Sequence, residues 1–278
     1  MHRNPNIAAL CSEFVAPEHV LQTTKLVNGL SNDNYLIKTA QQNYLLKCYK
    51  SHWPKIGLQA QTALSQHNVC PKPIWLDKAN RRAAFRYICG DIATNNYSID
   101  LVEKLARVHS YPLATQPMDI AKELVYYANS NIYQQHSRLI EDTLSAINDM
   151  PYNSGFCHND LVKDNLIVNS RGMYLIDFEY AQTNDVYFDL AALAVSLELN
   201  AHAEHTLLEQ YSAQQAIPSE FYCAYDKLRY FKVVFLVLCI GWYEQRDINN
   251  KASTLRAQLN KLLKTSTDLS AFIQTTLQ

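Results

Sequence analysis

The sequence predicts an α+β fold of two lobes, a small β-rich lobe over residues 1–87 and a larger, mainly helical lobe over residues 88–278. Short apolar runs separated by polar turns fill the first part, a pattern typical of strands. After Ser98, apolar residues recur at helical spacing. The pattern changes near residues 87–90, where we expect a hinge. Hydrophobic residues make up 48% of the 278, enough apolar material for a core in each lobe.

A β-hairpin is predicted near the start of the smaller lobe. Residues 35–37 and 44–46 are apolar runs on either side of a polar stretch, and Lys47 falls on the second strand. The other elements expected in this lobe are bounded by turns or prolines: a helix over 58–67, and strands over 74–76 and 83–88.

The larger lobe is predicted to be helical with one interruption. Helical spacing begins at Leu101, and a longer helical stretch is expected over residues 120–147. Residues 166–168 and 174–176 are short apolar runs around a polar turn, which predicts a second hairpin. After Asp189 the pattern returns to helix.

Composition narrows the function. A formal net charge of -1 lacks the positive field that nonspecific nucleic-acid binding requires, so we expect no nucleic-acid partner. The seven cysteines are scattered without a CxxC pair, which is typical of reduced thiols in a cytosol. No signal peptide is indicated, and the longest apolar run, 233–240, is too short to cross a bilayer. We expect a cytoplasmic protein without a membrane partner, of undefined oligomeric state.

The strongest chemical signal is a pair of segments on either side of the second hairpin. Residues 157–165 read CHNDLVKDN and residues 175–180 read LIDFEY. Phosphoryl transfer requires a positioned acceptor hydroxyl, a group that takes its proton, and cations on the phosphate oxygens. Asp160 is the candidate base. Asn165 and Asp177 offer hard oxygen ligands from the two strands of one hairpin, a donor type that Mg²⁺ prefers.

These segments resemble the aminoglycoside phosphotransferase and choline kinase superfamily, particularly its choline/ethanolamine kinase and bacterial thiamine kinase branch. The resemblance rests on HxDxxxxN followed by a DFE triplet. It extends to residues 28–35 (NGLSNDNY), 184–191 (NDVYFDLA) and 240–244 (IGWYE). Those enzymes are similar to protein kinases in fold, so the resemblance implies a two-lobed, protein-kinase-like fold.

The resemblance implies a small-molecule kinase that uses ATP and Mg²⁺ and transfers phosphate to an alcohol. Asp160 would be the catalytic base. The resemblance assigns the nucleotide and metal contacts to Lys47 on the α- and β-phosphates, Ser31 and Asn32 in the covering turn, the backbone of Tyr87 and Cys89 at the adenine, and Asn165 and Asp177 on the metal.

Acceptor-binding residues are expected beside these groups. Glu179 lies two residues after Asp177 on a segment expected to be extended, so it should face the same side, toward a second metal or a cationic acceptor. Trp242 and Tyr243 are expected to line the acceptor pocket, where their rings can contact a cation, with Glu179 or Glu244 as its counter-charge. Choline, ethanolamine or thiamine is favoured, with an aminoglycoside or homoserine as the alternative.

Two other interpretations of the function stay open. The phosphate-contacting lysine of kinases is usually held by a helix glutamate, yet no acid lies between Asp33 and Asp77. Gln59, Gln61 or an acid from the other lobe would have to orient Lys47. A nucleotide-binding pseudokinase is therefore one alternative.

A metal-dependent phosphate hydrolase is the other alternative, and it would use His158, Asp160 and Asp177. His158 itself is expected to brace its loop by hydrogen bonding. Asp189 is expected to cap a helix or to brace the same loop.

Overall fold

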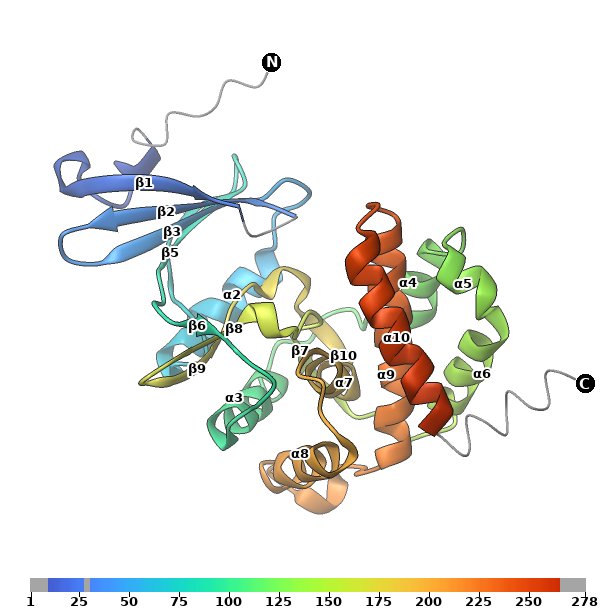
Figure 1. Cartoon of the computed structure of the whole chain (residues 1–278). Coiled ribbons are helices and arrows are strands. Elements are labelled where there is room, and N and C mark those ends of the chain that lie inside the picture. Colours follow the sequence, from blue (N-terminus) through green and yellow to red (C-terminus); the bar gives the residue numbers. More distant parts are fainter. Residues whose placement is uncertain (1–9, 28–30, 266–278) are drawn as a thin grey trace, which may run out of the picture. The chain divides into compact units, whose positions relative to one another are not determined.

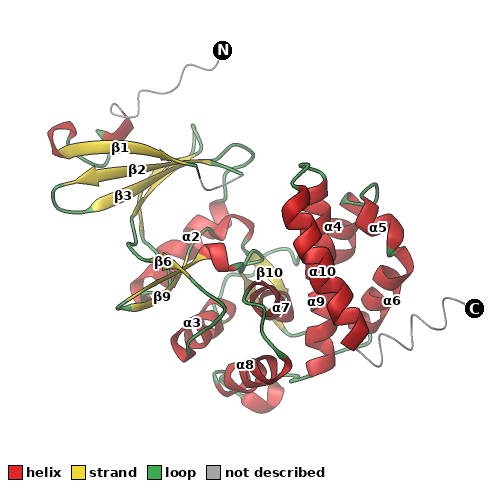
Figure 2. Cartoon of the chain, in the orientation of Figure 1, coloured by secondary structure: helices red, strands yellow, loops and turns green. Residues whose placement is uncertain are grey.

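The computed structural model describes residues 10–27 and 31–265 and divides the chain into two compact units (Figure 1). The first unit comprises Met1–Ala93 with Asp164–Tyr180, and the second comprises Thr94–Lys163 with Ala181–Gln278. Strands dominate the first unit and helices the second, which confirms the α+β prediction (Figure 2). The lobe boundary expected at residues 87 and 88 stays a prediction.

The described residues of the first unit form a five-stranded antiparallel sheet in the order β1-β2-β3-β5-β4. The strands are β1 (Val20–Leu26), β2 (Asp33–Thr39), β3 (Asn43–Cys48), β4 (Pro73–Asp77) and β5 (Arg82–Arg86). The predicted hairpin is β2–β3, in which Asn34 lies opposite Lys47. Strand β1 was not predicted, because five of its seven residues are exposed and the sequence there shows no alternation of apolar and polar residues.

Helix α2 (Lys55–Leu64) lies in the same unit and contributes Leu58 to a core cluster with Tyr49, Ala83 and Phe85. The helix begins three residues earlier than expected, and a 3₁₀ turn, η2 (Ser65–His67), follows it. On its other side the sheet buries Ile37 and Leu46 completely. Two-sided burial of the central strands fixes the register of β3, and with it the position of Lys47.

A three-stranded sheet completes the first unit, with β8 (Leu166–Asn169) between β6 (Asp91–Ile92) and β9 (Gly172–Leu175). The β8–β9 hairpin confirms the second predicted hairpin. Gly172 has φ 121° at its turn, a conformation that favours glycine. At the open end, the Ile176 N–H donates to the Asn165 carbonyl over 2.9 Å. Asn165 and Asp177 therefore lie at the same end of this hairpin.

The second unit is built around α9 (Tyr225–Glu244), which contacts six other helices. The helices it contacts are α4 (Ile120–Tyr126), α5 (Asn131–Gln135), α6 (Ser137–Asn148), α7 (Tyr187–Ser196), α8 (Ala201–Ala213) and α10 (Asn249–Thr265). Helix α3 (Ile99–His109) contacts α8 and strand β7 (Ser154–Cys157), which pairs with β10 (Gln182–Asp185).

The continuous helical stretch expected over 120–147 is wrong, because the structure divides it into α4, α5 and α6. Ser130 causes one break, since its hydroxyl accepts the Tyr133 N–H and so caps a new helix. Among the described residues, no helix has the length and apolar composition needed to cross a bilayer.

Candidate active site

The segment that carries Asp160 follows strand β7 directly. Asn159 has φ 61°, so the backbone turns sharply there. His158 is completely buried, and its Nδ1 accepts the Asp160 N–H over 3.3 Å. Asp160 is partly exposed. His158 therefore braces the loop by hydrogen bonding, and the Asp160 carboxylate retains access to solvent.

Asp189 holds this loop from the first turn of α7. Its two carboxylate oxygens accept the backbone N–H groups of His158 and Asn159 over 2.7 and 2.8 Å. The side chain of Asp189 is fully buried. Since hydrogen bonds to a charged group are the strong ones, Asp189 fixes the two residues that precede Asp160.

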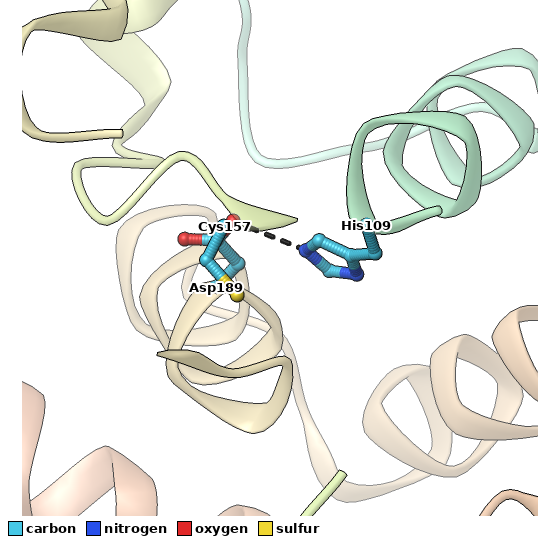
Figure 3. Close-up of side chains that lie close together, drawn as sticks. All are labelled: His109, Cys157 and Asp189. Carbon is cyan, nitrogen blue, oxygen red and sulfur yellow. Dashed lines mark hydrogen bonds and ion pairs between the residues drawn. The ribbon is translucent and has the colours of Figure 1, made fainter. Parts of the chain in front are cut away.

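His109, Cys157 and Asp189 lie close together behind the loop (Figure 3). His109 Nε2 is 3.1 Å from Asp189 Oδ2, and its Nδ1 is 2.6 Å from Tyr211 Oη. Both ring nitrogens and both carboxylate oxygens are thus engaged within the protein. Burial raises the pKa of the Cys157 thiol, and the carboxylates of Asp189 and Asp185 raise it further. The hydrogen bonds of His109 and Asp189 account for this cluster as a brace of the loop.

Lys47 and Asp177 form the centre of the site in the first unit. The Lys47 ammonium is paired with the Asp177 carboxylate and lies 3.9 Å from Glu179 Oε2. The Lys47 side chain is only 7% exposed, and a buried charge without an opposite charge is costly, so the two carboxylates stabilise the ammonium in this position. Burial raises the pKa of the neighbouring Tyr49, and Asp177 and Glu179 add to that rise.

Glu179 lies in a 3₁₀ turn, η4 (Phe178–Tyr180), so the extended segment expected here is wrong. Asp177, with φ 66°, turns the chain into η4 and directs Glu179 toward the sheet. Glu179 Oε2 accepts a hydrogen bond from Asn32 Nδ2 over 2.5 Å. Within residues 10–27 and 31–265, Glu179 Oε1 is buried and has no hydrogen-bond partner.

The predicted nucleotide and metal residues are thereby brought together in part. Lys47, Asn32, Asp177 and Glu179 form one cluster, and Asn165 lies at the hairpin end beside Asp177. Ser31 is exposed next to Asn32. Residues 28–30 of the predicted covering turn lie outside the described residues. Asp160 belongs to the second unit and precedes Asn165 by five residues in the chain.

The backbone expected to receive the adenine follows strand β5. The Tyr87 N–H donates to the Asn43 carbonyl over 3.0 Å, which adds one hydrogen bond to the β3–β5 pairing after the last residue of β5. The Cys89 carbonyl accepts the Asn169 side chain over 2.8 Å, and Cys89 itself is exposed. The strand ends at Arg86, because the chain leaves the sheet after this last bond.

Helix α9 brings the predicted acceptor residues into the second unit. Burial, together with the nearby Asp160 carboxylate, raises the pKa of Cys239. Trp242 and Tyr243 follow Cys239 by three and four residues, so they share its helix face. The Trp242 ring carries the Arg246 guanidinium at 3.9 Å on one face.

Glu244, the alternative counter-charge, is already engaged. Its carboxylate pairs with Arg256 and accepts the Ile132 N–H over 3.2 Å. Lys251 lies 5.5 Å from the centre of the Tyr243 ring. The chain's own cations therefore occupy part of the aromatic surface expected for an acceptor.

The sequence did not point to His109 or Tyr211. Both lie on helices far from residues 157–165 in the chain, and their spacing shows only helical periodicity. His109 ends α3, where a helix-terminal histidine has an ordinary interpretation as a favourable cap. Only the tertiary contact with Asp189 gives it a role at this site.

Comparison with known proteins places these observations in a family. The model of the phosphotransferase enzyme family matches residues 22–221. Protein LicA of Haemophilus influenzae is 32% identical over 93 residues, 33% of this chain and 35% of that protein, so the match spans about a third of that relative. The thiamine kinase of Escherichia coli O157:H7 is 25% identical over 256 residues, 85% of this chain and 86% of that protein.

A solved structure extends the likeness to the whole fold. The crystal structure of choline kinase LicA from Streptococcus pneumoniae superimposes with a TM-score of 0.75, at 20% identity over 93% of this chain and 98% of that one. At this identity the likeness shows the fold alone, and it confirms the kinase-like fold expected from the sequence. Because the family model covers most of the chain, this protein belongs to the phosphotransferase enzyme family.

Proposed function

We propose that this chain transfers the γ-phosphoryl group of ATP, with Mg²⁺, to the hydroxyl of a small cationic alcohol such as choline, ethanolamine or thiamine. The observation that carries the proposal is the buried Lys47 ammonium paired with the partly exposed Asp177 carboxylate, at the hairpin end where Asn165 also lies. A buried ammonium beside a carboxylate of this kind suits the phosphates and metal of a nucleotide.

The donors at this hairpin end fit a magnesium ion. Asn165 and Asp177 supply amide and carboxylate oxygens, and Glu179 Oε1 is a buried acceptor oxygen without a partner among the described residues. Mg²⁺ prefers such hard oxygen ligands and keeps phosphate oxygens in its shell. When bound, it would neutralise charge on the phosphates. Asn165 and Asp177 are the residues proposed to hold it.

The nucleotide contacts follow from the remaining groups of the first unit. Lys47 is proposed to contact the α- and β-phosphates, with Ser31 and Asn32 beside them. At the adenine we expect the Tyr87 carbonyl and the Cys89 N–H to act, since the Tyr87 N–H and the Cys89 carbonyl are already engaged.

Asp160 is proposed to accept the proton of the acceptor hydroxyl. The hydroxyl oxygen then bonds to the γ-phosphorus of ATP, while the bond from that phosphorus to the β-phosphate oxygen breaks and ADP leaves. Its position fits this role, because Asp189 and His158 fix the backbone around it while its carboxylate stays partly exposed. A positioned base of this kind contributes roughly 10²–10⁴-fold to a rate.

The choice of a cationic acceptor rests on the residues around Asp160 and on the named relatives. Trp242 and Tyr243 share a helix face with Cys239, which lies near Asp160. Aromatic faces attract cations, and Arg246 on Trp242 demonstrates that attraction in this chain. Two relatives are named choline kinase and thiamine kinase, and both of those substrates are cationic alcohols.

An acceptor panel tests the proposal. Purified protein with ATP and Mg²⁺ would be offered choline, ethanolamine, thiamine, homoserine and kanamycin, and ADP formation would be measured. We expect turnover with one of the first three. Turnover confined to homoserine or kanamycin would refute the assignment to choline, ethanolamine or thiamine, and tight ATP binding without turnover on any acceptor would favour the pseudokinase alternative.

A further inference from the structure

Lys47 lacks the helix acid that usually holds a kinase lysine. Residues 34–76 contain neither aspartate nor glutamate, so helix α2 carries no carboxylate at all. Yet the Lys47 ammonium is 7% exposed and needs an opposite charge. Both carboxylates that the structure places near it, Asp177 and Glu179, come from the segment after strand β9.

The packing of α2 explains why the acid can come from that segment. A Cβ atom at Gly57 would lie 1.8 Å from the carbonyl oxygen of Phe178. The helix backbone therefore packs directly against turn η4, and only glycine permits this approach. Gln61 lies one turn further along the same helix face. With the two backbones in contact, Glu179 in η4 reaches Lys47 without any acid on α2.

Glu179 is also fixed more firmly than a solvent-facing acid. Its side chain is 2% exposed, and Oε2 accepts Asn32 Nδ2 over 2.5 Å while lying 3.9 Å from Lys47 Nζ. Asn32 in turn accepts the Lys50 N–H through Oδ1 over 3.2 Å. One carboxylate thus connects strand β3 with the segment that leads into strand β2.

We propose that Glu179 is a positioning residue that replaces the missing helix acid: it orients Lys47 toward the phosphates and holds Asn32 beside them. This inference rests on the proposed function, in which Asp177 serves the metal. Once Asp177 binds the metal, its charge is shared, and Glu179 remains as the carboxylate that holds Lys47.

The test separates positioning of Lys47 from metal binding by measuring nucleotide affinity without metal. Calorimetry in EDTA would compare ATP binding to the wild type, Glu179→Gln, Lys47→Met and the double variant. We expect Glu179→Gln to weaken metal-free ATP binding about 10-fold. The double variant should lose little beyond Lys47→Met, because the two residues act as one unit. Asp77→Asn, which changes a half-buried acid at the end of strand β4 in the same sheet, is the control and should match the wild type.

A second-site variant supplies a gain of function. Gln61→Glu introduces an acid into α2, so in the Glu179→Gln background it should restore most of the lost metal-free affinity for ATP. A Glu179→Gln protein with wild-type metal-free affinity but a raised Mg²⁺ requirement would overturn the proposal and make Glu179 a metal ligand. If Glu179→Gln does not fold, the double variant is compared with Lys47→Met instead, because it removes both members of the pair together. A metal-free ATP affinity of the double variant far below that of Lys47→Met would overturn the proposal.

The same binding data distinguish this inference from the proposed function. A wild type that turns over no acceptor, yet whose metal-free ATP binding depends on Glu179 and Lys47 together, would refute the acceptor proposal alone. Turnover of choline or thiamine with metal-free affinity insensitive to Glu179 would refute the positioning role alone.

Discussion

Replacing Asp189 with asparagine removes one acceptor from the brace behind the catalytic loop. The two Asp189 oxygens accept the His158 and Asn159 N–H groups separately, so the new amide group would face one buried N–H with another donor. A hydrogen bond to a charged group contributes about 1.5–3 kcal/mol, and loss of the charge weakens both bonds. We therefore expect Asp189→Asn to lower the free energy of unfolding by about 3 kcal/mol, equivalent to roughly 6–12 °C in Tm.

The functional loss should exceed the loss of stability. Asp160 follows the two braced residues directly, and a shift of about 1 Å in a reacting group can cost on the order of 100-fold in rate. Urea unfolding would give the stability, and kcat would be measured at a temperature where the variant is folded. We expect kcat to fall on the order of 100-fold, with a smaller change in the KM for ATP.

Glu204→Gln is the matched control. Glu204 is also a buried acid of the second unit, but its partners are Tyr225 and Lys232, away from the catalytic loop. It should lose stability and keep kcat in the folded protein. An Asp189→Asn enzyme with wild-type kcat, or a Glu204→Gln enzyme that loses as much kcat, would show that the brace does not position Asp160.

Three further predictions concern other parts of the chain. Lys227→Met should lower the free energy of unfolding, measured in urea, by about 3–5 kcal/mol, because Lys227 pairs with buried Asp185 over 2.6 Å and its removal leaves the Asp185 carboxylate buried without that partner. A loss below about 1 kcal/mol would contradict this expectation. ATP should slow alkylation of the exposed Cys89 thiol, as followed by mass spectrometry, and should leave alkylation of Cys223, another exposed thiol, unchanged; equal slowing at both thiols would refute adenine binding at Cys89. Gly57→Ala should lower the free energy of unfolding, measured by thermal unfolding, by roughly 1–3 kcal/mol, because the alanine Cβ would meet the Phe178 carbonyl. Alanine is the better helix former, so a rise in Tm would show that α2 can shift away from that carbonyl.

Local pattern was sufficient where each element has its own signal. The apolar runs around short polar turns predicted both hairpins, and with them the positions of Lys47 and Asp177. Strand β1 could not be predicted, because an exposed edge strand lacks an alternating apolar pattern. The division of residues 120–147 depended on the cap at Ser130, which apolar periodicity does not reveal.

The sequence was sufficient to select the candidate residues of the site, and it did not reveal which of them contact one another. The motif spacing identified Asp160, Asn165 and Asp177 as candidates. The partner of Lys47 was beyond the sequence, because Glu179 reaches it only through the 3₁₀ turn that follows a left-handed Asp177. His109 was also missed, since its contact with Asp189 joins residues 80 positions apart.

The measurement that tests the central claim most directly is the appearance of the phosphorylated acceptor itself. Phosphorus NMR or mass spectrometry would follow product formation from ATP, Mg²⁺ and choline or thiamine with the wild type and with Asp160→Asn. We predict a phosphomonoester of one cationic alcohol, formed at least about 100-fold more slowly by Asp160→Asn. A product formed equally fast by both proteins would contradict the role of Asp160, and the absence of any phosphorylated cationic alcohol would contradict the proposed function.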